Sequence, residues 1–327
     1  MKKKVKLNHD VVTFALVVLL YAVVAFLLYS GSLTRQIANM LIPISVYIVL
    51  AVSLNLVVGL LGELSLGHGG FLSVGLFSGC LVAIALSATS LPLFVRLPLS
   101  MIVGGLVAMV FGFIVGLPAL RLKGDYLAIV TLACGEIIKN IITNLDITGG
   151  ALGLNTGAIY SNAKTLLPYA AVLVLLTVLV MMNLKRSKHG RAIMAIRDNP
   201  IAAQSVGLNL TKYKLMAFVT SAALAGAAGA LYGLNYSSLQ SVKFNFNTSI
   251  LVLVFVVLGG LGNIWGSLLS AAALTILPEA LRQFADYRML VYAIVLIFVM
   301  LATNNPRFKA FFAKLLPRRH SVEEKEV

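Results

Sequence analysis

Apolar residues run along this chain in long blocks that short polar stretches separate. The blocks fall near 11–30, 38–61, 66–87, 98–120, 126–144, 166–184, 213–237, 248–277 and 289–303. A helix needs about 20 apolar residues to cross a bilayer, and several of the blocks approach or exceed this length. The block at 248–277 is interrupted by GGLGN, so it predicts either one broken helix or two short crossings. The pattern as a whole predicts an all-α, polytopic membrane protein.

The composition supports this fold class. Of the 327 residues, 60% are hydrophobic and 11% are charged, whereas about 25% are charged in a typical soluble domain. The length fits a single transmembrane domain over residues 1–327, with no room for a second, soluble domain. The apolar run from Val11 to Tyr29 follows the basic start MKKKVKLNHD, as in a signal peptide, but it is longer than the ~7–15 residues of such a segment. We therefore expect a retained first helix with a cytoplasmic N-terminus.

Lysine and arginine are unevenly distributed among the polar stretches. Residues 1–10 hold four, 121–125 two, 184–214 seven and 304–327 six, whereas 31–37, 88–97, 145–165 and 238–247 hold one each. Because basic loops stay in the cytoplasm, the first group should be cytoplasmic and the second external. This alternation gives ten crossings if 248–277 contributes two, with eight as the fallback, and a cytoplasmic basic tail at 304–327. The net charge of +15 lies mostly in these loops and tails, so it does not indicate nucleic-acid binding.

A weak internal repeat connects two glycine-rich stretches, VGLLGEL at 58–64 and LGGLGNI at 258–264. At an offset of 200 positions, Gly59 matches Gly259, Leu61 matches Leu261 and Gly62 matches Gly262. The same offset aligns the helices expected to start near Val11 and Thr211, which both follow a basic segment. This favours two weakly related halves in parallel, a plan common among transporters. A chance match in a sequence rich in glycine and leucine is the alternative.

The stretch GLLGELSLGHGG at 59–70 interrupts an apolar block with five glycines, Glu63, Ser65 and His68. One interpretation is a tight turn at the cytoplasmic surface, where Glu63 is solvated. The other is a broken helix that lines a pathway, because unwound backbone at membrane depth persists only where protein or a water-filled cavity surrounds it.

Glu136 lies about ten residues into the block that begins at Tyr126, near the middle of the membrane. Glu136, Lys139, Asn140 and Thr143 recur with helical spacing and therefore share one face. An ionised group that faces lipid there costs at least about 2.5 kcal/mol, so this face should point into the bundle. The face holds either a structural Glu136–Lys139 pair or groups that contact the substrate or a gate. The external loop at 146–157 is either a plain loop or a surface for an external partner.

Catalytic and cofactor motifs do not appear in the sequence. It has no G-x-x-x-x-G-K-[ST] phosphate loop and no G-x-S-x-G nucleophile motif. The histidines at 9, 68, 189 and 320 lack the spacing of metal ligands, and Cys80 and Cys134 lie in apolar stretches. We therefore expect no catalytic residues, no metal site, no cofactor and no enzymatic activity.

The polar stretch at 185–212 contains a short predicted helix. Asp198 or Asn199 can cap it, Pro200 suits its first turn, and Gly207 can end it in a left-handed conformation. Ala202, Ala203 and Val206 should form a small apolar face. A helix of about two turns is not stable alone, so it must pack against the bundle or another protein. The basic residues before it are alternatively a contact for anionic lipid.

Several stretches together resemble a known family of permeases. They are RLKGDYLAIVTLACGEII, the TGG that follows it, HGRAIMAIRDNPIAAQSVGLNLTKYKLMAFVTSAALAGAAGALYG and VVLGGLGNIWGSLL. These resemble the LivM type of ABC importer permease, which moves branched-chain amino acids across the bacterial inner membrane. The resemblance covers roughly Val46 to Arg282, and 189–233 is its most specific part. The family often has glutamine where this chain has Glu63.

The resemblance implies a multi-pass protein of the bacterial cytoplasmic membrane that works with a second related permease, two ATPase subunits and an external solute-binding protein. It also implies that 185–212 is a coupling loop, which transmits ATP-driven motion from an ATPase subunit. The implied coupling residues are Arg197, Asp198, Asn199, Pro200, Ile201, Ala202, Ala203, Val206 and Gly207. The candidates for the translocation pathway are Glu63, Ser65, His68, Glu136 and Asn140.

Other functions remain open from the sequence. Importers of urea, amides or nucleosides have similar permeases. A secondary transporter that uses Glu63, His68 and Glu136 as a proton relay is a different class, and a purely structural scaffold is a third. The transported solute, its contacts with these three side chains, and the choice between a homodimer and a heterodimer are not determined by the sequence.

Overall fold

The computed structural model describes residues 9–281, except 90 and 123, together with 290, 293, 294 and 297. In this part of the chain, seven helices are long and apolar enough to span a membrane, and two apolar helices are shorter. The polytopic helical fold is therefore confirmed. The count of ten is not, since most of the block at 289–303 and all of the tail at 304–327 fall outside the described residues.

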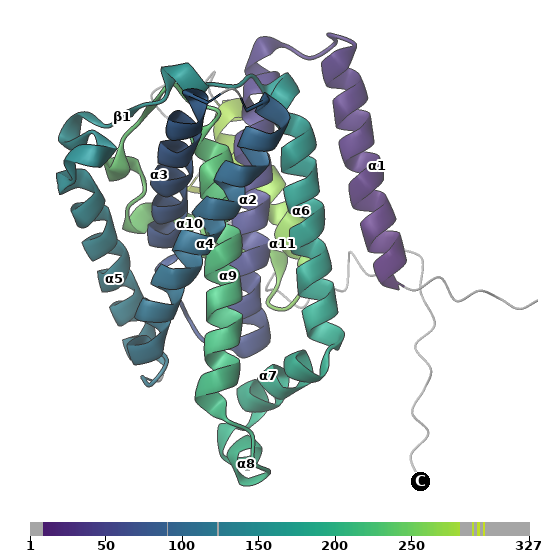
Figure 1. Ribbon diagram of the computed structural model, residues 1–327. Coiled ribbons are helices and arrows are strands. Elements are labelled where there is room, and N and C mark those ends of the chain that lie inside the picture. Colours follow the sequence, from purple (N-terminus) through teal and green to yellow (C-terminus); the bar gives the residue numbers. More distant parts are fainter. Residues whose placement is uncertain are drawn as a thin grey trace, which may run out of the picture. The chain divides into compact units, whose positions relative to one another are not determined.

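The helices follow one another along the chain with few other elements (Figure 1). They are α1 (His9–Tyr29), α2 (Arg35–Asn55), α3 (His68–Ser87), α4 (Leu93–Ala119), α5 (Asp125–Asn144), α6 (Ala163–Arg186), α7 (Lys188–Asp198), α8 (Pro200–Ser205), α9 (Leu210–Gly233), α10 (Phe246–Gly259) and α11 (Ile264–Ala280). α2 continues directly into the π-helix η1 (Leu56–Leu61). Short 3₁₀ turns η2 (Asp146–Thr148), η3 (Gly150–Leu152), η4 (Gly157–Ile159) and η5 (Ser241–Lys243) lie in two of the loops. The chain divides into units at 1–275 and 276–327, and the features described below lie in the first.

Small residues bring α3, α4 and α9 close together. A Cβ on Gly75 of α3 would overlap the backbone of Gly226 in α9, and a Cβ on Gly112 of α4 would lie 2.5 Å from the Ala222 Cβ. Small side chains allow the backbones of membrane helices to approach each other and gain packing contacts. α2 is also deeply buried, whereas α1 lies at the edge of the bundle beside α6 (Figure 1).

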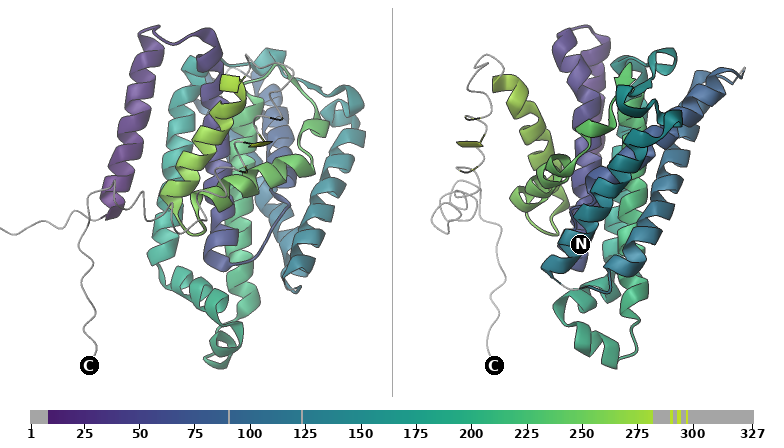
Figure 2. Two further views of the ribbon diagram at one scale, coloured as in Figure 1. Left: turned by 180° about the vertical axis from the view of Figure 1, so that it is seen from behind. Right: turned by 90° about the vertical axis from the view of Figure 1, so that its left-hand side faces the viewer.

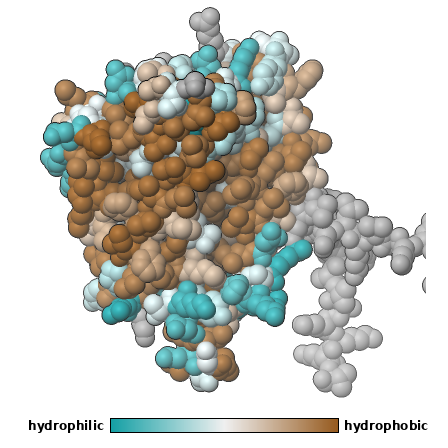
Figure 3. Space-filling view, in the orientation of Figure 1, coloured by the Kyte–Doolittle hydropathy of each residue, from teal (hydrophilic) through white to brown (hydrophobic). Residues whose placement is uncertain are grey.

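The two ends of the bundle have different character. At one end, α7 and α8 lie beyond the ends of α2 and α9 (Figures 1 and 2). At the other end, β1 (Leu154–Asn155) pairs with β2 (Ser238–Leu239), and the Tyr29 hydroxyl donates to the Lys164 carbonyl at 3.0 Å. Apolar residues cover the middle of the face in Figure 3, and polar residues gather towards its two ends. This is the distribution that a bilayer-spanning bundle requires.

The apolar block at 248–277 forms two helices. α10 ends at Gly259 and α11 begins at Ile264, and Gly260 and Gly262 between them have positive φ angles of 89° and 76°. The Ser270 hydroxyl donates to the Phe255 carbonyl, so α10 and α11 form a helical hairpin with its tip at 260–263. The GGLGN interruption is therefore a real break with a helix on each side, and the two separate crossings stay a prediction.

Candidate functional site at the basic end of the bundle

The polar stretch after α6 folds into two helices. The Ser187 hydroxyl caps α7 by accepting from the Gly190 N–H at 3.0 Å, and α7 buries Ile193 and Ile196. The sequence analysis missed α7, although Ser187 is a good capping residue and the two isoleucines have helical spacing. α7 joins α8 to the end of α6.

The predicted ends of α8 are confirmed. The Asn199 side chain accepts from the N–H groups of Ile201 and Ala202 at 3.1 and 3.0 Å, Pro200 is the first helical residue, and Gly207 has a φ of 86°. Asparagine caps a helix in this way because its carbonyl oxygen replaces the missing intrahelical acceptor.

The predicted apolar face of α8 is wrong. Ala203 is 4% exposed and packs within the chain, whereas Ala202 is exposed and Val206 is 77% exposed. The reason is that α8 packs only by the side on which Ala203 lies, and Ala202 lies about 100° away around the helix. The larger apolar side chains exposed here are Ile201, at 80% exposure, and Val206, directly after α8.

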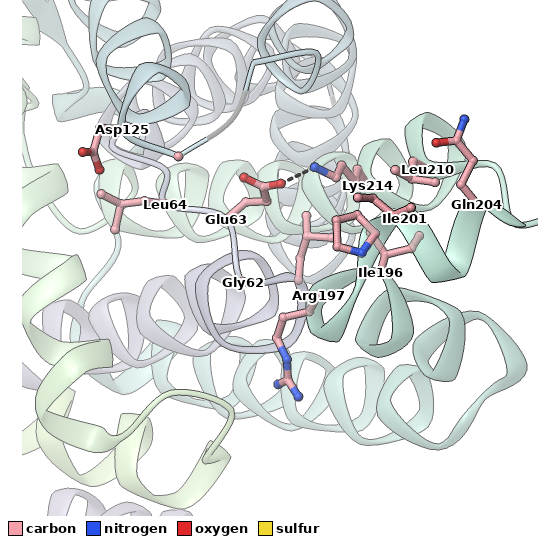
Figure 4. A pocket seen from close by; sticks show the side chains of 13 residues that line it. Gly62, Glu63, Leu64, Asp125, Ile196, Arg197, Ile201, Gln204, Leu210 and Lys214 are labelled. Carbon is pink, nitrogen blue, oxygen red and sulfur yellow. Dashed lines mark hydrogen bonds and ion pairs between the residues drawn. The ribbon is translucent and has the colours of Figure 1, made fainter.

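A cavity of about 580 Å³ lies between α8 and the rest of this end. Its lining comes from the connector after η1, the start of α5, the end of α7 and the start of α9 (Figure 4). The lining residues of these segments are Gly62, Glu63, Leu64, Asp125, Arg197 and Lys214. The cavity therefore brings together segments that are far apart in the sequence.

Glu63 forms an ion pair with Lys214 in this lining (Figure 4). The two side chains are only 14% and 11% exposed, and they join the connector to the first turn of α9. The expectation of a solvated Glu63 is therefore wrong. A carboxylate with so little access to water needs a compensating charge, which Lys214 supplies.

Arg197 connects α7 to η1. Its guanidinium donates to the Gly59 carbonyl at 3.2 Å and to the Asp198 carboxylate at 2.8 and 3.0 Å. A Cβ on Gly62, which has a φ of 77°, would lie 2.5 Å from the Arg197 Cγ, so the arginine stem packs directly on this glycine. Lys185, at the end of α6, donates to the Gly262 carbonyl at 3.2 Å.

Ser65 and His68 lie inside the bundle, and neither is exposed by more than 1%. His68 Nε2 lies 3.1 Å from the Ser221 hydroxyl and 3.4 Å from the Ser53 hydroxyl, whereas His68 Nδ1 and the Ser65 hydroxyl have no hydrogen-bond partner among the described residues. The part of the unwound segment next to α3 is thus enclosed by protein, as unwound backbone at membrane depth must be, whereas Gly62 at its start is exposed.

Glu136 pairs with Lys139, and its Oε1 accepts from the Phe246 N–H at 2.8 Å at the start of α10. The pair expected from the sequence is present. The expectation that the whole face points inward is wrong in part, because Asn140 is exposed. Glu136 is also the more exposed of the two carboxylates, at 30% against 14% for Glu63.

A family profile described as the permease component of the branched-chain amino acid transport system matches residues 36–300. The chain belongs to this permease family. It is 36% identical over 287 residues to the high-affinity branched-chain amino acid permease LivM of Salmonella typhimurium and to that of Escherichia coli. It is 26% identical over 310 residues to the ribose import permease RbsC of Haemophilus influenzae, a match that covers 89% of this chain and 92% of RbsC.

The two LivM matches cover 78% of this permease and 66% of the relatives, so the chain spans slightly less than two thirds of their length. No solved structure gives a significant match.

Two further residues of this permease escaped the sequence analysis. Lys214 was counted only as a basic loop residue, and Asn55 was not singled out, although it is a polar residue within the apolar block at 38–61. Asn55 is fully buried and makes two hydrogen bonds to the tip of the α10–α11 hairpin and a third to Ser267 in the first turn of α11. Its isolation among apolar residues was the available sign, because a buried amide requires partners.

Proposed function

We propose that this chain is a membrane-spanning permease subunit of an ATP-binding-cassette importer that passes branched-chain or related amino acids into the cell. Membership of the permease family and the 36% identity to LivM support this function. The sequence lacks a phosphate-binding loop, which fits ATP hydrolysis by separate subunits. The likeness to RbsC supports an importer of another small solute as the second candidate.

The proposed partners are a second, related permease, two ATPase subunits and an external solute-binding protein, in the bacterial cytoplasmic membrane. The end that carries α7 and α8 is placed in the cytoplasm, because residues 184–214 hold seven lysines and arginines. Ten crossings, two weakly related parallel halves and cytoplasmic termini complete this topology. The proposed coupling residues are those of 197–203 together with Val206 and Gly207.

One observation carries the proposal for α8. Ile201 on α8 and Val206 directly after it are exposed apolar side chains, and α8 lies beyond the ends of α2 and α9 (Figure 1). Large apolar side chains exposed on an otherwise polar element indicate an interaction surface. The carboxylate of Asp198 and the exposed amide of Gln204 surround them with polar groups, as at the rim of a protein interface. These features favour docking on an ATPase subunit.

The pathway residues remain a proposal. The Glu136–Lys139 pair is partly exposed on a helix of membrane length, and Asn140 is exposed beside it. Charged and polar groups that face lipid at membrane depth are costly. This favours a surface on α5 that the second permease covers, with Ser65 and His68 deeper in the bundle and Glu63 at its basic end.

The substitution Ile201→Glu tests the docking of α8. A carboxylate without a partner in a packed interface costs several kcal/mol, on the order of 2–5. We expect normal membrane insertion and loss of the ATPase subunits on co-purification. Gln204→Glu, an exposed change on the same helix, is the matched control. Ala203 is a poor test position, because its burial within the chain means that a larger side chain would disturb the permease itself.

Ile201→Lys separates the docking hypothesis from a contact with anionic lipid. Added positive charge should favour a lipid contact but still disrupt a protein interface. Full recovery of the ATPases together with normal transport in Ile201→Glu contradicts the coupling role.

A further inference from the structure

The side chain of Asn55 joins two distant parts of the bundle. Its Nδ2 donates to the Asn263 carbonyl at 3.1 Å and to the Ser267 hydroxyl at 2.8 Å, and its Oδ1 accepts from the Gly262 N–H at 2.8 Å. An asparagine amide has two N–H donors and one carbonyl acceptor, so its donors and its acceptor all bind the hairpin, at its tip and in the first turn of α11. We call these four residues the Asn55 clasp.

The orientation of the amide follows from its partners. A backbone N–H can only donate and a backbone carbonyl can only accept, so the contacts with Gly262 and Asn263 fix which end of the amide is oxygen. The side chain is fully buried, and water therefore cannot replace a lost partner. The clasp is a specific connection between α2 and the hairpin.

The backbone around Asn55 is unusual. Asn55 is the last residue of α2, where the helix widens into the π-helix η1. π-helical turns are rare and often occur at functional sites. Gly59 of η1 lies against the clasp, because a Cβ there would overlap the Asn55 Oδ1 and the Gly262 nitrogen. Only glycine leaves room for this approach.

The two segments that the clasp connects, η1 at the end of α2 and the hairpin tip, also each accept a hydrogen bond from a basic residue at this end of the bundle. Arg197 of α7 donates to the Gly59 carbonyl on η1, and Lys185 donates to the Gly262 carbonyl on the hairpin tip, each at 3.2 Å. These hydrogen bonds form a continuous path from α7 to η1 through Arg197, and from the end of α2, which continues into η1, to the hairpin through Asn55.

We propose that Asn55 is a positioning residue for transport, whose buried amide makes the α10–α11 hairpin move together with α7 and α8. The proposal rests on the proposed function, in which an ATPase subunit displaces α8. Without the amide, η1 could still follow α7, but the hairpin tip would keep its packing on Gly59 and, of the described hydrogen bonds to the rest of the bundle, only that from Lys185. ATP hydrolysis would then continue with little movement of solute.

The test uses the complete importer in liposomes, with radiolabelled leucine as the solute. In Asn55→Leu, which keeps a similar volume, we expect the leucine transported per ATP hydrolysed to fall about tenfold, within the usual range of coupling between sites. Hydrolysis and recovery of the ATPases should be retained. Ser45→Ala is the matched control, because it removes the buried 2.9 Å hydrogen bond with Tyr21 from the same helix without touching the clasp.

A second readout follows the hairpin tip itself. Backbone N–H groups at 260–263 should exchange with deuterium faster in Asn55→Leu than in Ser45→Ala, because Gly262 loses its acceptor. If Asn55→Leu does not assemble, Ser267→Ala is the alternative variant. It removes the hydroxyl to which the Asn55 Nδ2 donates, so the leucine transported per ATP hydrolysed should fall by a smaller factor.

An unchanged ratio of leucine to ATP overturns the proposal, and so does a parallel fall of transport and hydrolysis, which would indicate a merely structural role. Failure of the proposed function has a different signature. In that case Ile201→Glu retains the ATPases, whatever the result at Asn55.

Discussion

Two glycine segments of this permease, 59–64 and 259–264, share a sequence pattern and a left-handed glycine but not their contacts. Gly62 and Gly262 both have a positive φ, 77° and 76°; Gly62 follows the last residue of η1, whereas Gly262 lies in the turn between α10 and α11. The next position differs. Glu63 in the first segment carries a charge that Lys214 neutralises, whereas Asn263 in the second is exposed and offers its backbone carbonyl to Asn55.

The surroundings of the two glycines differ as well. Gly62 lies under the Arg197 stem, whereas the nearest atom to a Cβ on Gly262 would be the Gly59 carbonyl oxygen at 3.7 Å. The comparison shows that glycine permits the left-handed turn in both segments, because only glycine adopts this conformation without strain. The long-range neighbours then determine whether the turn is held by charge, by packing or by an uncharged amide.

The largest effect is expected from Lys214→Met, which removes the charge that holds the first segment. Glu63 would then be a nearly buried carboxylate without a partner, and breaking such a pair destabilises by about 3 kcal/mol. We expect a clear fall in the thermal midpoint of the purified permease. Lys212→Met, an exposed change on the same helix, should leave the midpoint nearly unchanged.

The combined exchange Glu63→Lys with Lys214→Glu sharpens this result. If attraction between the two charges is the cause, the exchange should restore part of the lost stability. If Lys214→Met alone is as stable as the wild type, charge is unimportant for the stability of the first segment.

A smaller effect is expected from alanine at the two left-handed glycines. Gly262→Ala adds only backbone strain, on the order of 1–2 kcal/mol. Gly62→Ala adds the same strain and also crowds the Arg197 stem, so its total should be larger by about 1 kcal/mol. Thermal midpoints of both variants measure the difference between the segments.

Gly62→Ala and Gly262→Ala should also be compared in a protein that carries Arg197→Ala. Removing the stem should reduce the cost of Gly62→Ala to that of Gly262→Ala and leave the cost of Gly262→Ala unchanged, because only the first glycine touches Arg197. Equal penalties for Gly62→Ala in both backgrounds would contradict the packing difference.

These contacts explain what the sequence predicted and what it did not. The fold class, the cap at Asn199, the start of α8 at Pro200 and the turn at Gly207 depend on local chemistry, and the structure confirms them. The partner of Glu63 lies 151 positions away, and no local pattern encodes such a contact.

The same reasoning accounts for the errors. The apolar face of α8 was wrong because it depended on which side of the helix packs on the bundle, and only the side of Ala203 does. Asn55 was missed because its partners lie 207 to 212 positions away, on the α10–α11 hairpin. The sequence predicted either one broken helix or two short crossings for this part of the chain. Periodicity therefore gives the helices, and the contacts between their ends require the structure.

The smallest effect is expected at Asn263, which occupies the position that Glu63 has in the first segment. Asn55 binds the backbone carbonyl of this residue, and Asn263→Ala keeps that carbonyl. The side chain is exposed, and exposed substitutions away from special contacts usually change stability by less than about 0.5 kcal/mol. Glu63→Ala, in contrast, leaves Lys214 without its partner and should be several-fold more destabilising.

Thermal midpoints of the two alanine variants measure this contrast, with Ser267→Ala as the intermediate case because it removes one hydrogen bond of the clasp. Similar losses in Asn263→Ala and Glu63→Ala would mean that the two segments are held in the same way and that their difference in charge has no consequence for stability.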